Sequence, residues 1–273
     1  MRTLLRDKRV LANYSGDLLR RNKRNMVDRA LHTPTTLKVS NAVDKPLLVL
    51  VIPVRNEAAN VGELLRRSAT VLSTIIFVDH ASSDNTGALL SAGGAEVIYC
   101  QEGGGFGRAV QTGLAAALPR ATGGYVGWLP GNLKSDPLDA ARLTASMHNS
   151  YVYGSVYVKA RRSGRPLRER MPSNLAGFVL SAWGLGPYWE VGGTPTIVPA
   201  LRAQVLLKGP EGLEFETFTV TAMHREKIRM LRLKAPFGSR IHGSSHWNRG
   251  LRTQMRLLLC LMREISRTRR NYR

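Results

Sequence analysis

The stretch LLVLVIPVRNEAANVGELLRRSATVLSTIIFVDHASSDNTGALL, residues 47–90, carries the main evidence for the fold. It opens with an apolar run of strand length, continues with a helical pattern over about residues 57–68, and returns to a second apolar run, IIFVD. Strands that are apolar throughout and alternate with helices are typical of a parallel sheet covered on both faces. The stretch therefore predicts a βαβ unit of an α/β protein.

The same alternation continues towards residue 137, which extends the prediction to a mostly parallel, twisted sheet with helices on both faces. Beyond the first unit, helices are expected at 86–92 and 108–118, and strands at EVIYC and YVGWLP. The second half is less regular. There we expect helices at 139–148, 174–183 and 214–224, and strands at 151–158 and 228–233.

Polar motifs follow each of the first four predicted strands. They are PVRNE at 53–57, DHASSDNT at 79–86, EGGGFGRAVQTG at 102–113 and PGNLKSDP at 130–137. Ligands of open α/β sheets bind at the carboxyl ends of the strands, so these motifs are the candidate binding residues.

Composition limits the classes of protein and partner. With 273 residues, 43% of them apolar, the chain can bury a substantial core, and its two cysteines do not suggest a disulfide framework. No apolar run reaches signal-peptide or membrane-span length, so a cytoplasmic protein is expected. The net charge of +21 predicts an anionic acceptor, membrane or nucleic acid as partner.

The order of the four motifs resembles that of the family 2 glycosyltransferases, which have the GT-A fold. In that family a strand ends in Pro-x-x-Asn-Glu, the next ends in an Asp-rich turn, a glycine-rich turn enters a helix, and an Asp-x-Asp motif follows. The resemblance implies a nucleotide-diphosphate sugar as donor, bound by Pro53, Arg55, Glu57, Asp79, Ser82, Arg108 and Asn132. A carboxylate at a strand end accepts hydrogen bonds from a nucleobase imide or a ribose, which suits Asp79 and Glu57; helix capping is the alternative role.

The glycine-rich motif does not have the spacing of a dinucleotide fingerprint, which disfavours a Rossmann oxidoreductase. We instead expect a tight turn that lets the backbone approach the donor. Arg108, near the start of the following helix, is then a candidate phosphate contact.

The fourth motif departs from the family pattern, because Pro130 and Asn132 stand where the family carries its two acids. Asn132 offers a metal only one neutral oxygen, so the sequence leaves a requirement for Mg²⁺ or Mn²⁺ open. Our hypothesis is that Lys134, together with Arg108, supplies the positive charge that stabilises the departing nucleoside diphosphate. A lysine facing solvent is the alternative.

The second half resembles polyprenol-phosphate glycosyltransferases more weakly. In WEVGGTPTIVP, Glu190 holds the position of that group's acid and is the candidate catalytic base, with an ion-paired or helix-terminal glutamate as the alternative. Candidate acceptor or phosphate contacts are Arg161, Arg240, His242 and Ser244. Lys159 belongs to the same basic run as Arg161 and is also expected to meet a phosphate.

Three functions follow from this resemblance and the charge. The leading one is sugar transfer to a polyprenyl phosphate at the membrane surface, with the enzyme peripheral at the inner face. The second is transfer to a modified base in DNA, and the third is a non-catalytic protein that binds nucleotide sugars or polyanions. The expected segments are a basic extension at 1–44, a nucleotide-sugar half at 45–138, an acceptor half at 139–246 and a basic amphipathic helix at 247–273.

Overall fold

The computed structural model describes residues 47–71, 73–100, 105–164 and 191–238, with single positions between 174 and 182 and between 259 and 266. The extension predicted at 1–44 lies outside these ranges. The helices predicted at 174–183 and 247–273 also lie outside them, except for those single positions.

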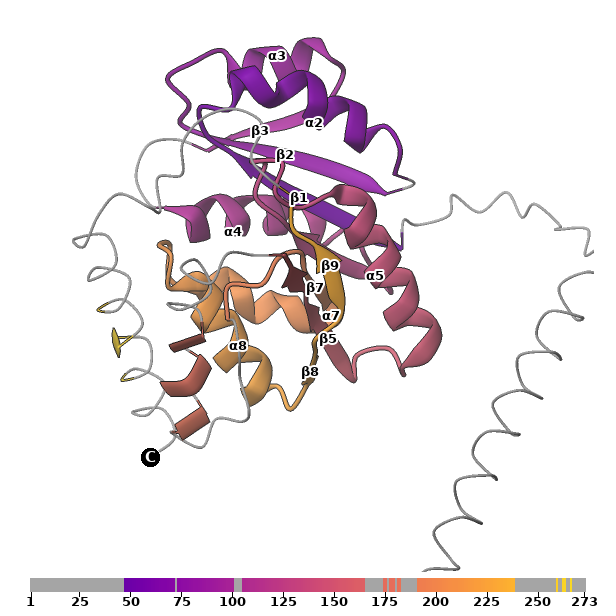
Figure 1. Cartoon of the computed structure of the whole chain (residues 1–273), viewed down its shortest axis with the longest axis vertical. Coiled ribbons are helices and arrows are strands. Elements are labelled where there is room, and N and C mark those ends of the chain that lie inside the picture. Colours follow the sequence, from indigo (N-terminus) through magenta and orange to yellow (C-terminus); the bar gives the residue numbers. More distant parts are fainter. Residues whose placement is uncertain are drawn as a thin grey trace, which may run out of the picture. The chain divides into compact units, whose positions relative to one another are not determined.

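A seven-stranded sheet forms the centre of the described part, in the order β3-β2-β1-β4-β7-β5-β8 (Figure 1). Its strands are β1 (Leu48–Val54), β2 (Thr74–His80), β3 (Glu96–Cys100), β4 (Tyr125–Trp128), β5 (Val156–Lys159), β7 (Thr196–Pro199) and β8 (Arg229–Leu231). All neighbouring strands are parallel except β7, which runs antiparallel to both β4 and β5. Two short strands, β6 (Arg161–Ser163) and β9 (Lys234–Pro236), pair in a separate ribbon.

Helices cover both faces of this sheet, as the sequence predicts. On one face lie α2 (Val61–Ser68), α3 (Thr86–Ala92) and α5 (Pro137–Ser150); on the other lie α4 (Phe106–Ala117), α7 (Ala200–Ala203), η2 (Gln204–Lys208) and α8 (Phe215–Arg225) (Figure 1). Successive residues of β1 join different cores, Leu50 and Ile52 on the first face and Val51 on the second. A strand buried on both faces is apolar at every position, which explains the run LVLVIPV.

The direction of the strand order changes between β1 and β4. From β1 the chain builds outward through β2 to β3, and then returns to place β4 on the other side of β1. Loops that leave the carboxyl ends of β1 and β4 consequently diverge, and such a point is the usual ligand crevice of an open α/β sheet.

Several predicted elements differ from the observed ones. The strand predicted at 151–158 is wrong in its first half, because a turn with Gly154 at φ +84° precedes β5. The strand predicted at 228–233 is shorter, because β8 ends at Leu231, and a further strand, β9, begins only at Lys234. The short strand β7 was not predicted, since four residues ending in Pro199 give too little pattern.

In the part of the chain that the structure describes, no helix combines the length and apolarity needed to span a membrane.

Candidate active site

Hydrogen bonds join the loops that follow β1 and β2. Asn56, which adopts a left-handed φ of 53°, donates its backbone N–H to Ser82 Oγ at 3.0 Å and accepts from the Ser83 N–H at 2.7 Å. The Glu57 N–H donates to Thr86 Oγ1 at 2.9 Å. These bonds hold the two predicted motifs together at one edge of the sheet.

Asp84 is a structural member of this edge. Its carboxylate accepts from the backbone N–H groups of Ala58 at 3.2 Å and Thr86 at 3.1 Å, and from the Thr86 hydroxyl. Burial by itself raises the pKa of Asp84, but these hydrogen bonds outweigh it and hold the pKa below its ordinary value. Asp84 therefore joins the β1 loop to the start of α3 as a carboxylate.

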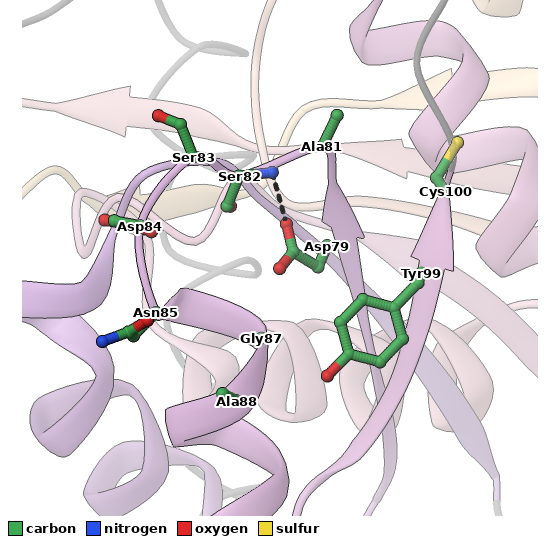
Figure 2. Close-up of a pocket in the computed structure, with 10 residues that line it drawn as sticks. All are labelled: Asp79, Ala81, Ser82, Ser83, Asp84, Asn85, Gly87, Ala88, Tyr99 and Cys100. Carbon is green, nitrogen blue, oxygen red and sulfur yellow. Dashed lines mark hydrogen bonds between the residues drawn. The ribbon is translucent and has the colours of Figure 1, made fainter.

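A cavity of about 700 Å³ opens beside the Asp-rich turn (Figure 2). Its lining comes from the 79–88 segment and the end of β3, namely Asp79, Ala81, Ser82, Ser83, Asp84, Asn85, Gly87, Ala88, Tyr99 and Cys100. The Asp79 carboxylate reaches it from the end of β2 and is only 5% exposed. One of its oxygens, Oδ1, accepts from the Ser82 N–H at 3.0 Å.

The shape of the cavity depends on Gly87, in the first turn of α3. A Cβ at this position would lie 2.4 Å from Asp79 Oδ2 and 2.6 Å from Tyr99 Cε1, both far inside contact distance. The missing side chain thus leaves room for the carboxylate and the tyrosine ring. Tyr99 is 61% exposed and forms the outer wall.

The structure brings only some of the predicted donor-binding residues to this cavity. Asp79 and Ser82 line it. Pro53 is buried within β1, Arg55 is exposed, and Glu57 is 8% exposed with its carboxylate accepting from Asn60 Nδ2. Glu57 therefore stabilises the loop after β1 and does not line the cavity. Sequence reasoning missed Gly87, which directly follows the Asp-rich motif, and Tyr99, which lies in β3.

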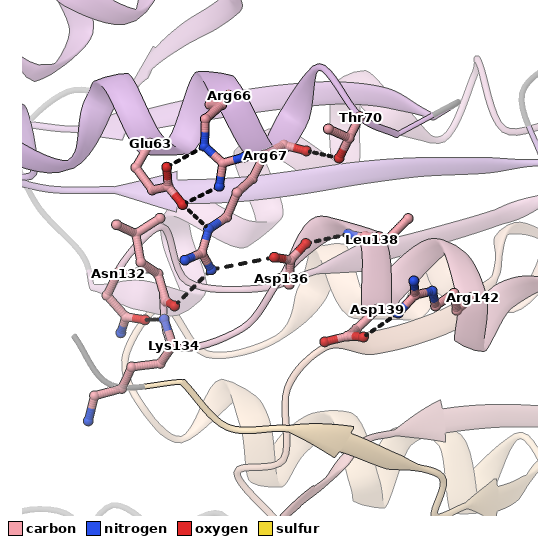
Figure 3. A network of polar contacts seen from close by, with 11 residues as sticks. Glu63, Arg66, Arg67, Thr70, Asn132, Lys134, Asp136, Leu138, Asp139 and Arg142 are labelled. Atoms are coloured by element: carbon pink, nitrogen blue, oxygen red, sulfur yellow. Dashed lines mark hydrogen bonds and ion pairs between the residues drawn. The ribbon is translucent and has the colours of Figure 1, made fainter. Parts of the chain in front are cut away.

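The segment after β4 is held both by hydrogen bonds among its own residues (Figure 3) and by bonds to distant ones. The Gly238 N–H donates to the Lys134 carbonyl at 2.9 Å, and Ser135 Oγ donates to the Thr194 carbonyl at 3.3 Å. Asn132 Oδ1 accepts from the Lys134 N–H at 3.2 Å, and Asp136 caps α5 by accepting from the Leu138 N–H at 2.9 Å. The Lys134 ammonium lies 5.1 Å from the centre of the Phe237 ring. Figure 3 shows the Lys134 side chain pointing away from the Arg67 network.

These residues do not fit a divalent metal ion. Mg²⁺ and Mn²⁺ prefer charged oxygen ligands, whereas the Asn132 oxygen is neutral and already accepts a hydrogen bond. The nearest carboxylate in sequence, Asp136, is engaged as a helix cap. Over the described ranges no group of three or more His, Cys, Asp and Glu side chains could hold a metal.

The glycine-rich turn before α4 does not present its backbone as predicted. The N–H groups of Gly105 and Arg108 donate to the Glu211 carbonyl at 3.0 and 2.9 Å, and that of Gly107 to the Gly212 carbonyl at 3.2 Å. A Cβ on Gly107 would lie 2.4 Å from the Pro210 carbonyl oxygen. At Gly105 and Gly107 the donor therefore cannot approach the backbone as expected, because the backbone of residues 210–212 occupies that space. The preceding residues of the motif, 102–104, lie outside the described ranges.

Arg108 itself forms an ion pair with Glu211 at 2.6 Å, and about half of each side chain is exposed. Its contact with a phosphate remains a prediction. An exposed pair of this kind contributes little to stability and opens readily.

Comparison with known proteins identifies the family. The model of glycosyl transferase family 2 matches residues 49–196, more than half of the chain. The chain belongs to glycosyl transferase family 2. No curated protein matches this family 2 glycosyltransferase at a significant level.

Solved structures share the fold of this glycosyltransferase. Glucosyl-3-phosphoglycerate synthase from Mycobacterium tuberculosis, in complex with Mn²⁺, UDP and glucosyl-3-phosphoglycerate, has a TM-score of 0.60 and 19% identity over 80% of each chain. The same enzyme with Mn²⁺, UDP-glucose and phosphoglyceric acid has a TM-score of 0.57, 19% identity, and coverage of 80% of this chain and 79% of its own. A mycobacterial protein has a TM-score of 0.61 and 20% identity, over 80% of this chain and 74% of its own. The predicted GT-A fold and glycosyltransferase class are thus confirmed.

Lys159 is not available to a phosphate, which corrects the expectation from its place in a basic run. It is the last residue of β5 and has no exposed surface. Its ammonium donates to Thr196 Oγ1 at 3.1 Å and pairs with Glu216, whose other oxygen accepts from Trp128 Nε1 at 2.9 Å. This buried network joins β4, β5, β7 and α8 of the glycosyltransferase.

The remaining predicted residues lie mostly beyond the described ranges. Glu190, Arg240, His242 and Ser244 fall outside them. Arg161 is the exposed first residue of β6, and its backbone N–H donates to the Leu233 carbonyl at 2.7 Å. Its guanidinium therefore stays a candidate acceptor contact.

Proposed function

We propose that this glycosyltransferase moves a sugar from a nucleotide-diphosphate sugar to a phosphate-bearing acceptor, a polyprenyl phosphate at the membrane surface. The observation that carries the proposal is the Asp79 carboxylate, buried yet lining a cavity at the carboxyl edge of the sheet. A buried carboxylate with an oxygen facing a cavity suits a ligand that donates hydrogen bonds.

The donor's base is the part of the ligand that fits this cavity. Ser82 donates to Asp79 Oδ1, so Oδ2 is the oxygen left to accept from an imide N–H such as that of uracil. Tyr99 offers an exposed aromatic ring beside it. UDP and UDP-glucose are bound by the M. tuberculosis synthase that shares this fold, which supports a uridine nucleotide as the first donor to test.

Positive charge supports the choice of an anionic acceptor. The chain's net charge of +21 attracts phosphate groups, and the synthase of similar fold was solved with phosphoglyceric acid, a phosphorylated molecule. The resemblance of residues 189–199 to polyprenol-phosphate glycosyltransferases favours a lipid phosphate among such acceptors. A phosphate is already ionised, so the enzyme has chiefly to orient it, with Glu190 as the candidate base for any proton that must leave.

Departure of the nucleoside diphosphate needs stabilisation of the negative charge that develops on it. Because the segment after β4 does not fit a metal ion, we assign the stabilisation of this negative charge to the ammonium of Lys134. This ammonium lies 5.1 Å from the centre of the Phe237 ring, on the segment that follows the carboxyl end of β4. Arg108 is the second candidate cation, after release from Glu211.

The test is a transfer assay with labelled nucleotide sugars, with and without a chelator. Extracted lipid phosphates, phosphoglycerate and hydroxymethylated DNA serve as rival acceptors. We expect transfer to lipid phosphate that survives chelation and falls about 10²-fold in Lys134→Ala. Lys208→Ala, which removes an exposed lysine from η2, is the matched control and should retain activity.

Transfer to DNA or phosphoglycerate alone would overturn the lipid acceptor. Loss of activity on chelation, with Lys134→Ala unaffected, would overturn the role of Lys134. Failure to bind any nucleotide sugar in a thermal-shift panel would favour the non-catalytic function instead.

A further inference from the structure

Arg67, near the end of α2, makes polar contacts with the segment that carries Lys134 (Figure 3). Arg67 Nη1 donates to the Leu133 carbonyl at 3.3 Å and lies 3.4 Å from Asp136 Oδ2. The Nε of the same guanidinium binds Glu63 Oε1 at 2.7 Å. One side chain therefore connects the end of α2, the turn after β4 and the start of α5.

The turn contacted by Arg67 has an unfavourable backbone conformation. Leu133 has a φ of 62°, in the left-handed region that residues with side chains rarely adopt. Its side chain is 2% exposed and packs in the core shared by α2 and α5. Such a conformation persists only where the surroundings hold it, and the carbonyl that follows this φ is the group to which Arg67 donates.

The electrostatics explain why an arginine is needed here. Glu63 is ionised at any assay pH, because hydrogen bonds from Arg66 and then Arg67 lower its pKa to about 2. Asp136 caps α5 with its other oxygen. A guanidinium presents several donors in a fixed plane, so Arg67 binds two carboxylates and a carbonyl together, which an ammonium on a flexible chain does less well.

We infer that Arg67 is a positioning residue for sugar transfer, which fixes the 132–136 segment so that Lys134 is presented to the donor diphosphate. The inference rests on the proposed role of Lys134. In enzymes that place acids here, a metal ion would also hold the segment against the donor. In this chain a cation of the protein itself, the Arg67 guanidinium, holds the segment from the side of α2.

The neighbouring arginine provides a matched control. Arg66 lies on the same turn of α2 and also binds Glu63, at 2.6 Å, but its side chain is 66% exposed against 22% for Arg67. Arg67 binds the Leu133 carbonyl and pairs with Asp136 directly, whereas Arg66 interacts with Asp136 only through the weak attraction between their charges. Arg66→Gln therefore removes a charge and a Glu63 contact without releasing the 132–136 segment.

The experiment is a double-mutant cycle on kcat, measured with saturating donor and acceptor. Arg67→Gln should lower kcat by about 10-fold or more, because displacement of a charged group by about 1 Å can cost up to about 10²-fold, while Arg66→Gln should stay within about twofold of the unchanged enzyme. The Arg67→Gln/Lys134→Ala double variant should be no slower than Lys134→Ala alone, since a positioning residue has no effect once the group it positions is gone.

Arg67→Lys keeps the charge and the helix, and should still lose part of kcat; it also tests the inference if Arg67→Gln fails to fold. The inference about Arg67 would be overturned if the Arg66→Gln and Arg67→Gln enzymes had equal kcat, or if the losses from Arg67→Gln and Lys134→Ala multiplied in the double variant. Either result would leave the proposed role of Lys134 untouched. A normal kcat for Lys134→Ala would instead overturn the proposed role of Lys134, and this inference with it.

Discussion

Replacement of Gly87 by alanine tests whether the Asp79 cavity binds the nucleotide. The added Cβ would lie 2.4 Å from Asp79 Oδ2 and 2.6 Å from Tyr99 Cε1. Tyr99 is 61% exposed, so its ring can swing outward. Asp79 is 5% exposed and its Oδ1 accepts from the Ser82 N–H at 3.0 Å, so the carboxylate can move aside only by leaving its place in the cavity.

The size of the effect follows from these distances. An ordinary contact between carbon and oxygen is about 3.3 Å, so Oδ2 must move by roughly 0.9 Å from its 2.4 Å position. That displacement removes a hydrogen bond from the ligand to a charged acceptor, worth about 1.5–3 kcal/mol. We therefore expect the Kd for the nucleotide to rise about 10- to 100-fold.

Isothermal titration with UDP measures this change directly, and the denaturation curve of the same sample reports folding. Gly62→Ala is the control, because a Cβ there meets no heavy atom within 4 Å and the residue also lies in the first turns of a helix. It should leave the Kd unchanged. If folded Gly87→Ala binds UDP as tightly as the Gly62→Ala control, the nucleotide does not use this cavity and the reasoning fails.

Three further predictions concern stability. Because the pKa of Asp84 is lowered in the folded state, the carboxylate stabilises the fold at pH values above its unfolded pKa, near 3.8, and this stabilisation is lost as the pH falls through the folded pKa. Asp84→Asn should therefore flatten the pH dependence of the free energy of unfolding below about pH 4. An unchanged slope would contradict this. Lys159→Met leaves the Glu216 carboxylate unpaired and should cost about 3 kcal/mol or more in urea denaturation; the double variant with Glu216→Gln should recover part of the loss, and a single variant of full stability would disprove the buried pair. In Gly113→Ala the new Cβ lies 2.2 Å from Val51 Cγ1, so overpacking should cost about 1–3 kcal/mol, which a neutral result would refute.

Much of the donor half could be predicted because its signals are local. The helix at 86–92 and the strand at 96–100 were predicted with the bounds observed for α3 and β3. Asp79 was predicted from its place at the end of a buried strand and Ser82 from the family resemblance of the motif that follows, and both line the cavity. Position at a strand end is a property of a few neighbouring residues, so a single sequence displays it.

The prediction failed where distant segments decide what a residue contacts. The glycines before α4 suggested an open phosphate-binding turn, but residues 210–212, about a hundred positions later, bind the backbone of Gly105 and Gly107. Lys159 was taken for a surface charge because the residues after it are basic. Its partner Glu216 is 57 residues away, and no pattern within the strand indicates the pair.

The sequence by itself determined the βαβ architecture, the edge of the sheet that carries the candidate site, and the absence of the acidic pair after β4. Each of these depends on periodicity or on residue type at a strand end, which are written along the chain. Only the tertiary structure decided that Gly87 makes room for Asp79 and Tyr99, that β7 enters the sheet antiparallel, and that Arg67 holds a turn 66 residues away. Those features depend on which surfaces meet when the sheet and helices pack. Packing brings together residues that are far apart in the sequence, and a single sequence does not indicate which distant residues will be in contact.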